Sequence, residues 1–74
     1  MPEKKIDATG LSCPLPLLKA KQALNSSESG TILQIVCDDP ASERDFKVFS
    51  KQSGHELISS ERSDDRFTYR IRKA

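Results

Sequence analysis

The sequence lacks several features on which specialised protein classes depend. Its 74 residues contain two cysteines, too few for a disulfide framework, so a small hydrophobic core must hold the fold together. Twelve Lys and Arg residues stand against 11 Asp and Glu, and this net charge of +1 argues against a dedicated nucleic-acid binder. Aromatic residues make up 5% of the chain, which leaves few rings on which bases could stack.

Long apolar runs are also missing. No stretch is long and apolar enough to span a membrane, and the first ten residues, MPEKKIDATG, contain no signal-peptide core. We therefore expect a cytoplasmic protein without membrane contact. Cytoplasmic cysteines stay reduced unless they are catalytic or redox-active. The length predicts a single domain over residues 1–74.

The hydrophobic pattern that is present predicts the element order βαβαββ. Strands are expected at residues 4–8, 31–37, 55–63 and 66–73, and the last two form a hairpin. The second of these strands, TILQIVC, is interrupted only by Gln34 and is expected to be a central strand. With two helices between the strands, this order indicates an α/β two-layer sandwich with both helices on one sheet face.

Both helices have recognisable ends. The first is expected over about residues 14–25, with an apolar stripe of Leu17, Ala20 and Leu24 and with Leu18 beside them. The second is expected between residues 39 and 54. There Asp39 is predicted as the N-cap, Pro40 as the first helical residue and Gly54 as the C-terminal stop.

The predicted topology brings polar and reactive residues to one edge of the sheet. Right-handed crossovers make the first three strands roughly parallel, so their carboxyl ends share an edge. That edge carries Cys13, Asp38 and Asp39, and we expect the hairpin tip there too. Function concentrates at such edges in open α/β sheets. The only histidine, His55, follows the second helix and so belongs to the opposite edge, which argues against a Cys/His dyad.

The stretch LSCPLPLLKAKQAL places a thiol at the start of a helix with two prolines. With Cys13 as the N-cap, Pro14, Leu15 and Pro16 are the first three helical residues. Because Pro16 has no N–H, only the Leu15 amide can donate to the Cys13 sulfur. A helix N-terminus lowers a cysteine pKa from about 8.5 into roughly the 3.5–7.5 range, whereas nearby carboxylates raise it. We expect a modestly lowered pKa at Cys13 and a functional thiol.

The segment GLSCPLPLLKAKQAL carries the Cys-Pro-x-Pro motif and resembles the TusA/SirA-like sulfur carriers. The resemblance continues through GTILQIVCDDPASERDF, GHEL and YRIRK, and it covers nearly the whole chain. It implies a mixed four-stranded sheet of order 1-2-4-3 in which the fourth strand is antiparallel.

The resemblance also implies an activity. Members of this family accept sulfane sulfur on the motif cysteine, here Cys13, as a persulfide and pass it to another protein. The implied donor is a cysteine desulfurase or another persulfide donor. The acceptor is a downstream sulfur-relay protein, in some members on the route to 2-thiouridine in tRNA. Such a carrier is a transfer protein with a catalytic-type cysteine rather than a stand-alone enzyme, and we expect neither cofactor nor metal.

Other residues near the motif are candidates for function on less specific grounds. Lys21, two turns into the first helix, and Asp39, beside the thiol, are candidate partner-docking residues, although a solvated lysine and a helix cap explain them as well. Cys37 ends the central strand and is expected to be a buried small hydrophobic residue. We expect a monomer that docks transiently and does not bind nucleic acid directly.

Two alternatives remain open at the level of the sequence. One is a thiol-independent RNA- or protein-binding regulatory module, because the same topology occurs in the C-terminal domain of translation initiation factor 3. The other is a redox sensor in which Cys13 and Cys37 form a disulfide, which requires their Cα atoms to lie within about 7 Å. Within the carrier interpretation, the sequence leaves tRNA thiolation, molybdenum-cofactor enzymes and sulfur oxidation as possible pathways.

Overall fold

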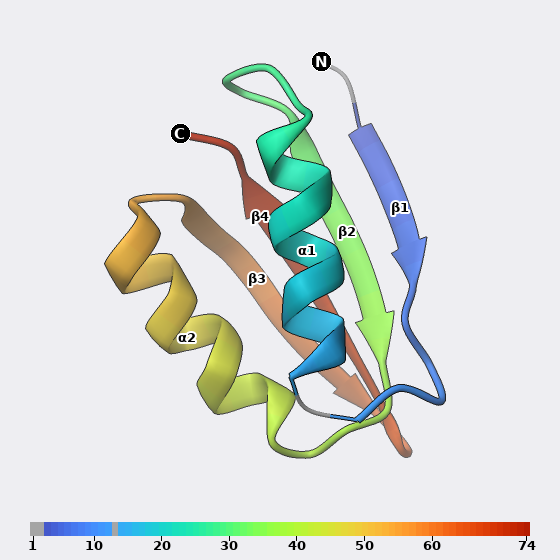
Figure 1. Cartoon of the computed structure of the whole chain (residues 1–74). Helices are drawn as coiled ribbons and strands as arrows, with labels where there is room; N and C mark the ends of the chain where they lie inside the picture. The colour runs from blue at the N-terminus through green and yellow to red at the C-terminus, as the bar shows by residue number, and fades with distance from the viewer. Residues whose placement is uncertain (1–2, 13) are drawn as a thin grey trace.

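Six elements follow one another in the predicted order. The computed structural model describes residues 3–12 and 14–74. The elements, shown in Figure 1, are β1 Glu3–Asp7, α1 Leu15–Asn25, β2 Ile32–Cys37, α2 Ser42–Ser53, β3 Glu56–Ser63 and β4 Arg66–Arg72. Strand bounds fall within one residue of the prediction at most ends, and the βαβαββ order is confirmed.

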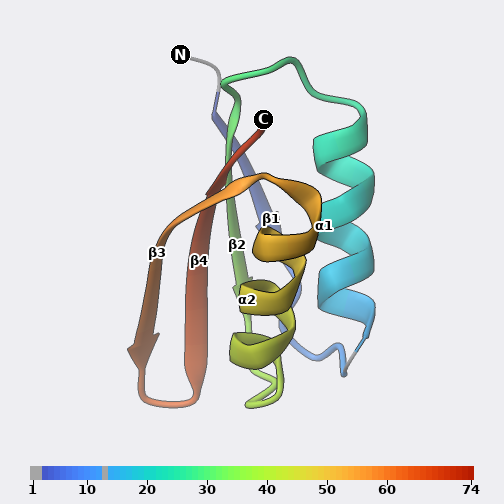
Figure 2. The same ribbon diagram turned by 90° about the vertical axis from the view of Figure 1, so that its left-hand side faces the viewer.

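The four strands form one mixed sheet of order β1-β2-β4-β3. β1 and β2 are parallel, while β4 is antiparallel to both β2 and β3. β2 is therefore an inner strand, as its apolar sequence predicts. Figure 2 shows both helices on one side of this sheet, so the two-layer architecture is confirmed and the other sheet face has no helix over it.

The core lies between the sheet and the two helices. Strand alternation sends Phe67, Tyr69 and Ile71 of β4 inward, while the residues between them lie on the bare face. β2 alternates in the same way. The buried side chains that complete this core are Ala8 after β1, Leu33, Ile35 and Cys37 from β2, Pro16, Ala20 and Leu24 from α1, and Phe46 and Phe49 from α2.

The core stripe of α1 differs from the prediction at Leu18. Pro16, Ala20 and Leu24 are buried at a spacing of four, whereas Leu18 is 44% exposed. Leu18 lies two residues from both Pro16 and Ala20, and at about 100° per residue this places it on the opposite side of the helix. Pro16, the second proline of the motif, was expected only to shape the helix start but occupies a core position.

The predicted cap of α1 is wrong. The N-cap is Pro14, for which the described residues show no side-chain cap hydrogen bond, and Leu15 is the first helical residue. The Leu15 amide donates to the Ser12 carbonyl at 2.9 Å, so the backbone already uses the one N–H that the prolines leave for a side-chain cap. Cys13, predicted as the cap, lies outside the described residues.

The predicted cap of α2 is also displaced. The N-cap is Ala41 and the helix begins at Ser42, so Asp39 and Pro40 precede it. Asp39 caps the turn before the helix instead: its Oδ1 accepts the Ala41 N–H at 3.0 Å and its carbonyl accepts the Ser42 N–H at 3.0 Å. This Asp-Pro turn satisfies the amides of the N-cap residue Ala41 and of the first helical residue Ser42.

The opposite end of the domain matches the prediction. Gly54 ends α2 in the left-handed region at φ +82°, and its N–H donates to the Ser50 carbonyl. His55 follows, and its Nδ1 accepts the Ala74 N–H at 2.9 Å, which places it beside the C-terminus. Figure 1 shows the C-terminus and the start of α1 at opposite ends of the sheet. In the described ranges 3–12 and 14–74, neither helix has the length and apolar character needed to cross a membrane.

Candidate functional site

The candidate site is the edge of the sheet at which β1 and β2 end. Both helices begin at this edge and the β3–β4 hairpin turns there, as the lower end of Figure 1 shows. Cys13 lies outside the described residues, and its two neighbours in the chain, Ser12 and Pro14, belong to this edge. The Ser12 carbonyl accepts the Leu15 N–H, and the Pro14 carbonyl accepts the Leu18 N–H at 3.0 Å.

A shallow hollow marks the same edge. Its volume is about 410 Å³, and the residues that line it are Gly10, Leu11, Ser12, Asp38, Asp39 and Pro40. It is thus formed by two loops, the β1–α1 loop that leads to Cys13 and the β2–α2 loop that follows Cys37. The hollow is an open surface feature rather than an enclosed cavity, a shape suited to contact with another protein surface.

Hydrogen bonds hold the first part of the β1–α1 loop. The Ala8 N–H extends the sheet by donating to the Val36 carbonyl at 2.7 Å. The Thr9 N–H and hydroxyl both donate to Asp7 Oδ1, at 3.0 and 2.6 Å. The chain therefore leaves β1 through a defined Asx turn.

The next residue of the loop is held from the neighbouring loop. The Gly10 N–H lies 3.1 Å from both Oδ1 and Oδ2 of Asp38, which is 28 residues away in the sequence. Gly10 adopts φ +82°, a left-handed conformation that favours glycine over any residue with a Cβ. The Leu11 N–H then turns back to the Ala8 carbonyl at 3.3 Å. Sequence reasoning treated Asp38 only as a charge near the thiol and missed this contact.

The electrostatics of the edge are mixed. Hydrogen bonds from the Thr9 side chain and backbone lower the pKa of Asp7, and the nearby positive charge of Arg66 lowers it further. Asp38 and Asp39 add acidic side chains on the other loop. The described residues of this edge therefore carry charges of both signs.

The motif residues divide into a buried and an exposed set. Pro16 is buried and fixes the first turn of α1 against the sheet. Leu15, inside the motif, is 46% exposed, and Leu18, two residues after it, is 44% exposed. Exposed apolar side chains beside a reactive group provide contact area for a partner protein.

The two predicted docking residues occupy different places. Asp39 lines the hollow at the motif edge. Lys21 is further along α1, with its ammonium 5.7 Å from the ring centroid of Phe49 in the groove between the helices. That cation–π contact gives Lys21 a structural role. The structure therefore brings Asp39, but not Lys21, to the hollow beside the motif.

Cys37 has the buried position that the sequence predicts. It belongs to the core, and burial raises the pKa of its thiol, although hydrogen bonds from the Ser42 side chain and the Asp39 backbone oppose the shift. A buried thiol with a raised pKa is a poor nucleophile and a poor partner for exchange. This environment disfavours the redox-sensor interpretation.

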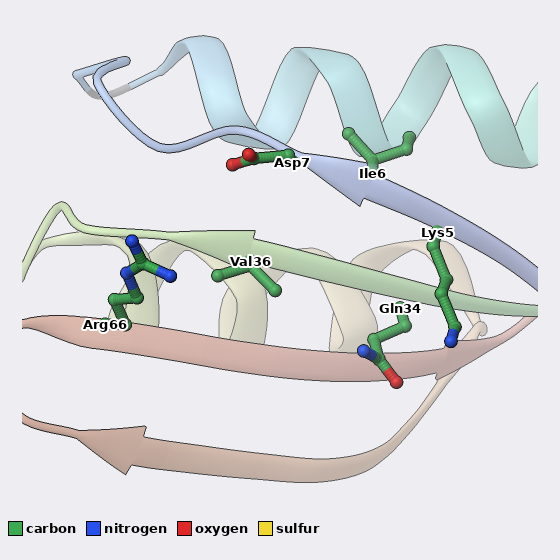
Figure 3. A pocket seen from close by; sticks show the side chains of 6 residues that line it. All are labelled: Lys5, Ile6, Asp7, Gln34, Val36 and Arg66. Atoms are coloured by element: carbon green, nitrogen blue, oxygen red, sulfur yellow. The ribbon is translucent and has the colours of Figure 1, made fainter.

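The described residues contain a further hollow but no cluster of metal ligands. Within residues 3–12 and 14–74, no three His, Cys, Asp or Glu side chains are grouped so that they could hold a metal ion. A hollow of about 310 Å³ lies where β1 and β2 meet the start of β4. Figure 3 shows the side chains that line it: Lys5, Ile6, Asp7, Gln34, Val36 and Arg66. Its charges are of both signs, and it lies apart from the hollow that contains Ser12.

Comparisons with known proteins agree with the geometry. The family model described as "Sulfurtransferase TusA" matches residues 4–73. The sulfur carrier protein TusA of Allochromatium vinosum is 43% identical over 72 residues, which cover 97% of this chain and 95% of the relative. A putative sulfur carrier protein of Archaeoglobus fulgidus is 42% identical over 73 residues, covering 95% of each chain.

The fold is also found in a solved structure. The crystal structure of a SirA-like protein from Desulfitobacterium hafniense superposes with a TM-score of 0.80 at 26% identity, covering 93% of this chain and 95% of that chain. The family match spans both helices and all four strands, including the motif, the Asp38–Asp39 loop and the hairpin. The chain belongs to the TusA sulfurtransferase family.

Proposed function

We propose that the protein is a sulfur carrier that accepts sulfane sulfur as a persulfide on Cys13 and transfers it to a downstream protein. The family match over residues 4–73, which includes Cys-Pro-Leu-Pro at residues 13–16, is the observation that carries this proposal. The open hollow lined by Ser12 supports it, because a carrier must present its thiol to the surface of another protein.

The acceptance step conserves atoms and electrons. The Cys13 thiolate attacks the terminal sulfur of a persulfide on the donor. A sulfur–sulfur bond forms on Cys13 as the sulfur–sulfur bond of the donor breaks, and the donor cysteine leaves as a thiolate. One sulfane sulfur moves without net oxidation, and the rate depends on the thiolate fraction and on access to the sulfur.

The delivery step repeats this exchange with the carrier as donor. A thiolate of the next protein attacks the terminal sulfur on Cys13 and restores the Cys13 thiolate. We propose a cysteine desulfurase as the sulfur source and a cytoplasmic sulfur relay, with 2-thiouridine synthesis in tRNA as the route to test first. In this proposal Leu15, Pro14 and Pro16 shape the surface around the thiol, and Asp39 contacts the partner.

Sulfur acceptance can be measured directly by intact mass. The protein is incubated with a cysteine desulfurase and L-cysteine without reductant, beside the Cys13→Ser and Cys37→Ser variants. We expect a gain of one sulfur atom in the wild-type protein and in Cys37→Ser but not in Cys13→Ser. Loss of the gain in Cys37→Ser alone, or its persistence in Cys13→Ser, would contradict the assignment to Cys13.

A negative result could mean that the right donor is absent from the assay or that the protein does not carry sulfur, and the experiment must distinguish the two. Several persulfide donors are therefore tried in parallel, including a rhodanese-type enzyme with thiosulfate. A wild-type protein that gains no sulfur from any of them would contradict persulfide transfer. A thiol-independent function retained by Cys13→Ser would then favour the binding-module alternative.

A further inference from the structure

The Asp38 side chain ties the β1–α1 loop to the β2–α2 loop. We propose that Asp38 is a positioning residue for sulfur transfer, whose carboxylate fixes the loop that leads into Cys13. Both carboxylate oxygens of Asp38 lie 3.1 Å from the Gly10 nitrogen, so the one N–H is held between them. This inference rests on the proposed function of Cys13 and adds a residue to it.

The backbone that carries the Asp38 carboxylate is held on both sides. Asp38 directly follows β2, whose last residue, Cys37, is buried in the core. The next residue, Asp39, begins the hydrogen-bonded turn that leads into α2. Asp38 is thus placed between an inner strand and a closed turn, and a group held in this way can fix a neighbouring loop.

Two residues that are held in place flank the motif cysteine, each three positions from it in the sequence. Gly10, held by Asp38, lies three residues before Cys13, and Pro16, buried in the core, lies three residues after it. Among the described residues, Asp38 is the hydrogen-bond acceptor of the Gly10 N–H. Removal of the Asp38 oxygens therefore loosens the Gly10 end of this short segment, where the bond from the Leu11 N–H to the Ala8 carbonyl remains, while the Pro16 end stays in place.

Position matters for this reaction because exchange between sulfur atoms needs the attacking, the attacked and the leaving sulfur roughly in line. A small displacement of a reacting group costs rate even when binding is unchanged. Asp38 is expected to act on the maximal rate of transfer, since it contacts the loop and not the transferred sulfur. A docking role would instead change the donor concentration that gives half the maximal rate.

The test compares Asp38→Ala, which removes the acceptor oxygens, with Asp38→Asn, which removes the charge but keeps one acceptor. Asp65→Asn, at the exposed hairpin tip, is the matched control for loss of a negative charge near this edge. The maximal rate and the half-saturating donor concentration are measured for sulfur transfer from a cysteine desulfurase. Amide hydrogen exchange of Gly10 is followed by NMR, with the sheet amide of Ala8 as an internal reference.

We expect Asp38→Ala to lower the maximal rate about tenfold with little change in the half-saturating concentration. We expect its Gly10 amide to exchange at least about tenfold faster, while the Ala8 amide is unchanged. Asp38→Asn should stay within about threefold of wild type in both measurements, because its Oδ1 still accepts the Gly10 N–H. Asp65→Asn should match the wild type.

Three results would overturn the inference: a normal maximal rate in Asp38→Ala, equal losses in Asp38→Asn and Asp38→Ala, or a change confined to the half-saturating concentration. Thermal unfolding of each variant identifies any loss that comes from a smaller folded fraction. Absence of sulfur on wild-type Cys13 would instead overturn the proposed function, and this inference with it. A functional wild type with unaffected variants removes only the role of Asp38.

Discussion

Ser42 Oγ and Tyr69 Oη lie 2.7 Å apart and share a hydrogen bond in the buried core. This bond ties the first residue of α2 to the middle of β4. Burial raises the pKa of Tyr69 to about 12, so the hydroxyl keeps its proton over the physiological range. The ring of Tyr69 stacks on Phe46, with centroids 4.5 Å apart. The start of α2, and with it the β2–α2 loop of the candidate site, is thereby docked on the sheet.

Tyr69→Phe removes the hydroxyl and keeps the stacked ring. The buried Ser42 hydroxyl then loses this partner, and we expect the free energy of unfolding to fall by about 1–3 kcal/mol. Urea denaturation followed by circular dichroism measures the change. In the double variant with Ser42→Ala, the loss should be smaller than the sum of the two single losses, because both remove the same bond. Strictly additive losses would show that the two hydroxyls do not stabilise each other.

Most of the fold could be predicted because local patterns and topology agree. Alternation in β4, the apolar run of β2 and the glycine at position 54 each fix one element or its end. The helix starts could not be predicted, because they depend on how the preceding turn folds. Asp39 caps that turn rather than the helix, and the Leu15 amide bonds to the backbone of Ser12 rather than to a side chain.

The location of the site at this edge of the sheet could be predicted, but the contacts within it could not. Right-handed crossover connections bring the two loops together, and this follows from the element order alone. The Asp38–Gly10 contact joins residues 28 apart and has no local pattern. The core position of Pro16 was missed because proline was considered only as a residue that shapes the helix start. The role of Cys13 stays a prediction that the sulfur-transfer assay decides.

Gly54→Ala tests the C-terminal stop of α2. Gly54 has φ +82°, and a Cβ in this left-handed region is strained even where there is space for it. We expect a loss of about 1 kcal/mol in the free energy of unfolding. Gln52→Ala, at an exposed position in the same helical turn, should change stability by less than about 0.5 kcal/mol. Equal effects of the two substitutions would rule out a special backbone requirement at Gly54.

The burial of Cys37 predicts slow reaction with thiol reagents. In a Cys13→Ser background, iodoacetamide should modify Cys37 at least about 100-fold more slowly under native conditions than in denaturing urea, since access requires the core to open. Intact mass recorded over time measures both rates. Rapid labelling of the native protein would show that Cys37 is accessible, and would restore the redox-sensor alternative.

His55 predicts a loss of stability in mildly acidic solution. His55 Nδ1 accepts the Ala74 N–H at 2.9 Å, which requires that this nitrogen carries no proton. Burial, followed by the positive charge of Lys73, lowers the pKa of His55 below its usual 6.5. The unfolded state therefore binds this proton more tightly. The contribution is fully present above pH 6.5 and is lost as the pH falls through the folded-state pKa.

The measurement is the free energy of unfolding from about pH 7.5 to about pH 5 in the wild-type protein and in His55→Asn. Asparagine can still accept the Ala74 N–H but does not titrate, so the variant should lose less stability over this range. Asp7 does not interfere, because its pKa lies below 3.8 and its contribution is lost only in stronger acid. If both proteins lose the same stability over this range, the acid sensitivity comes from groups other than His55.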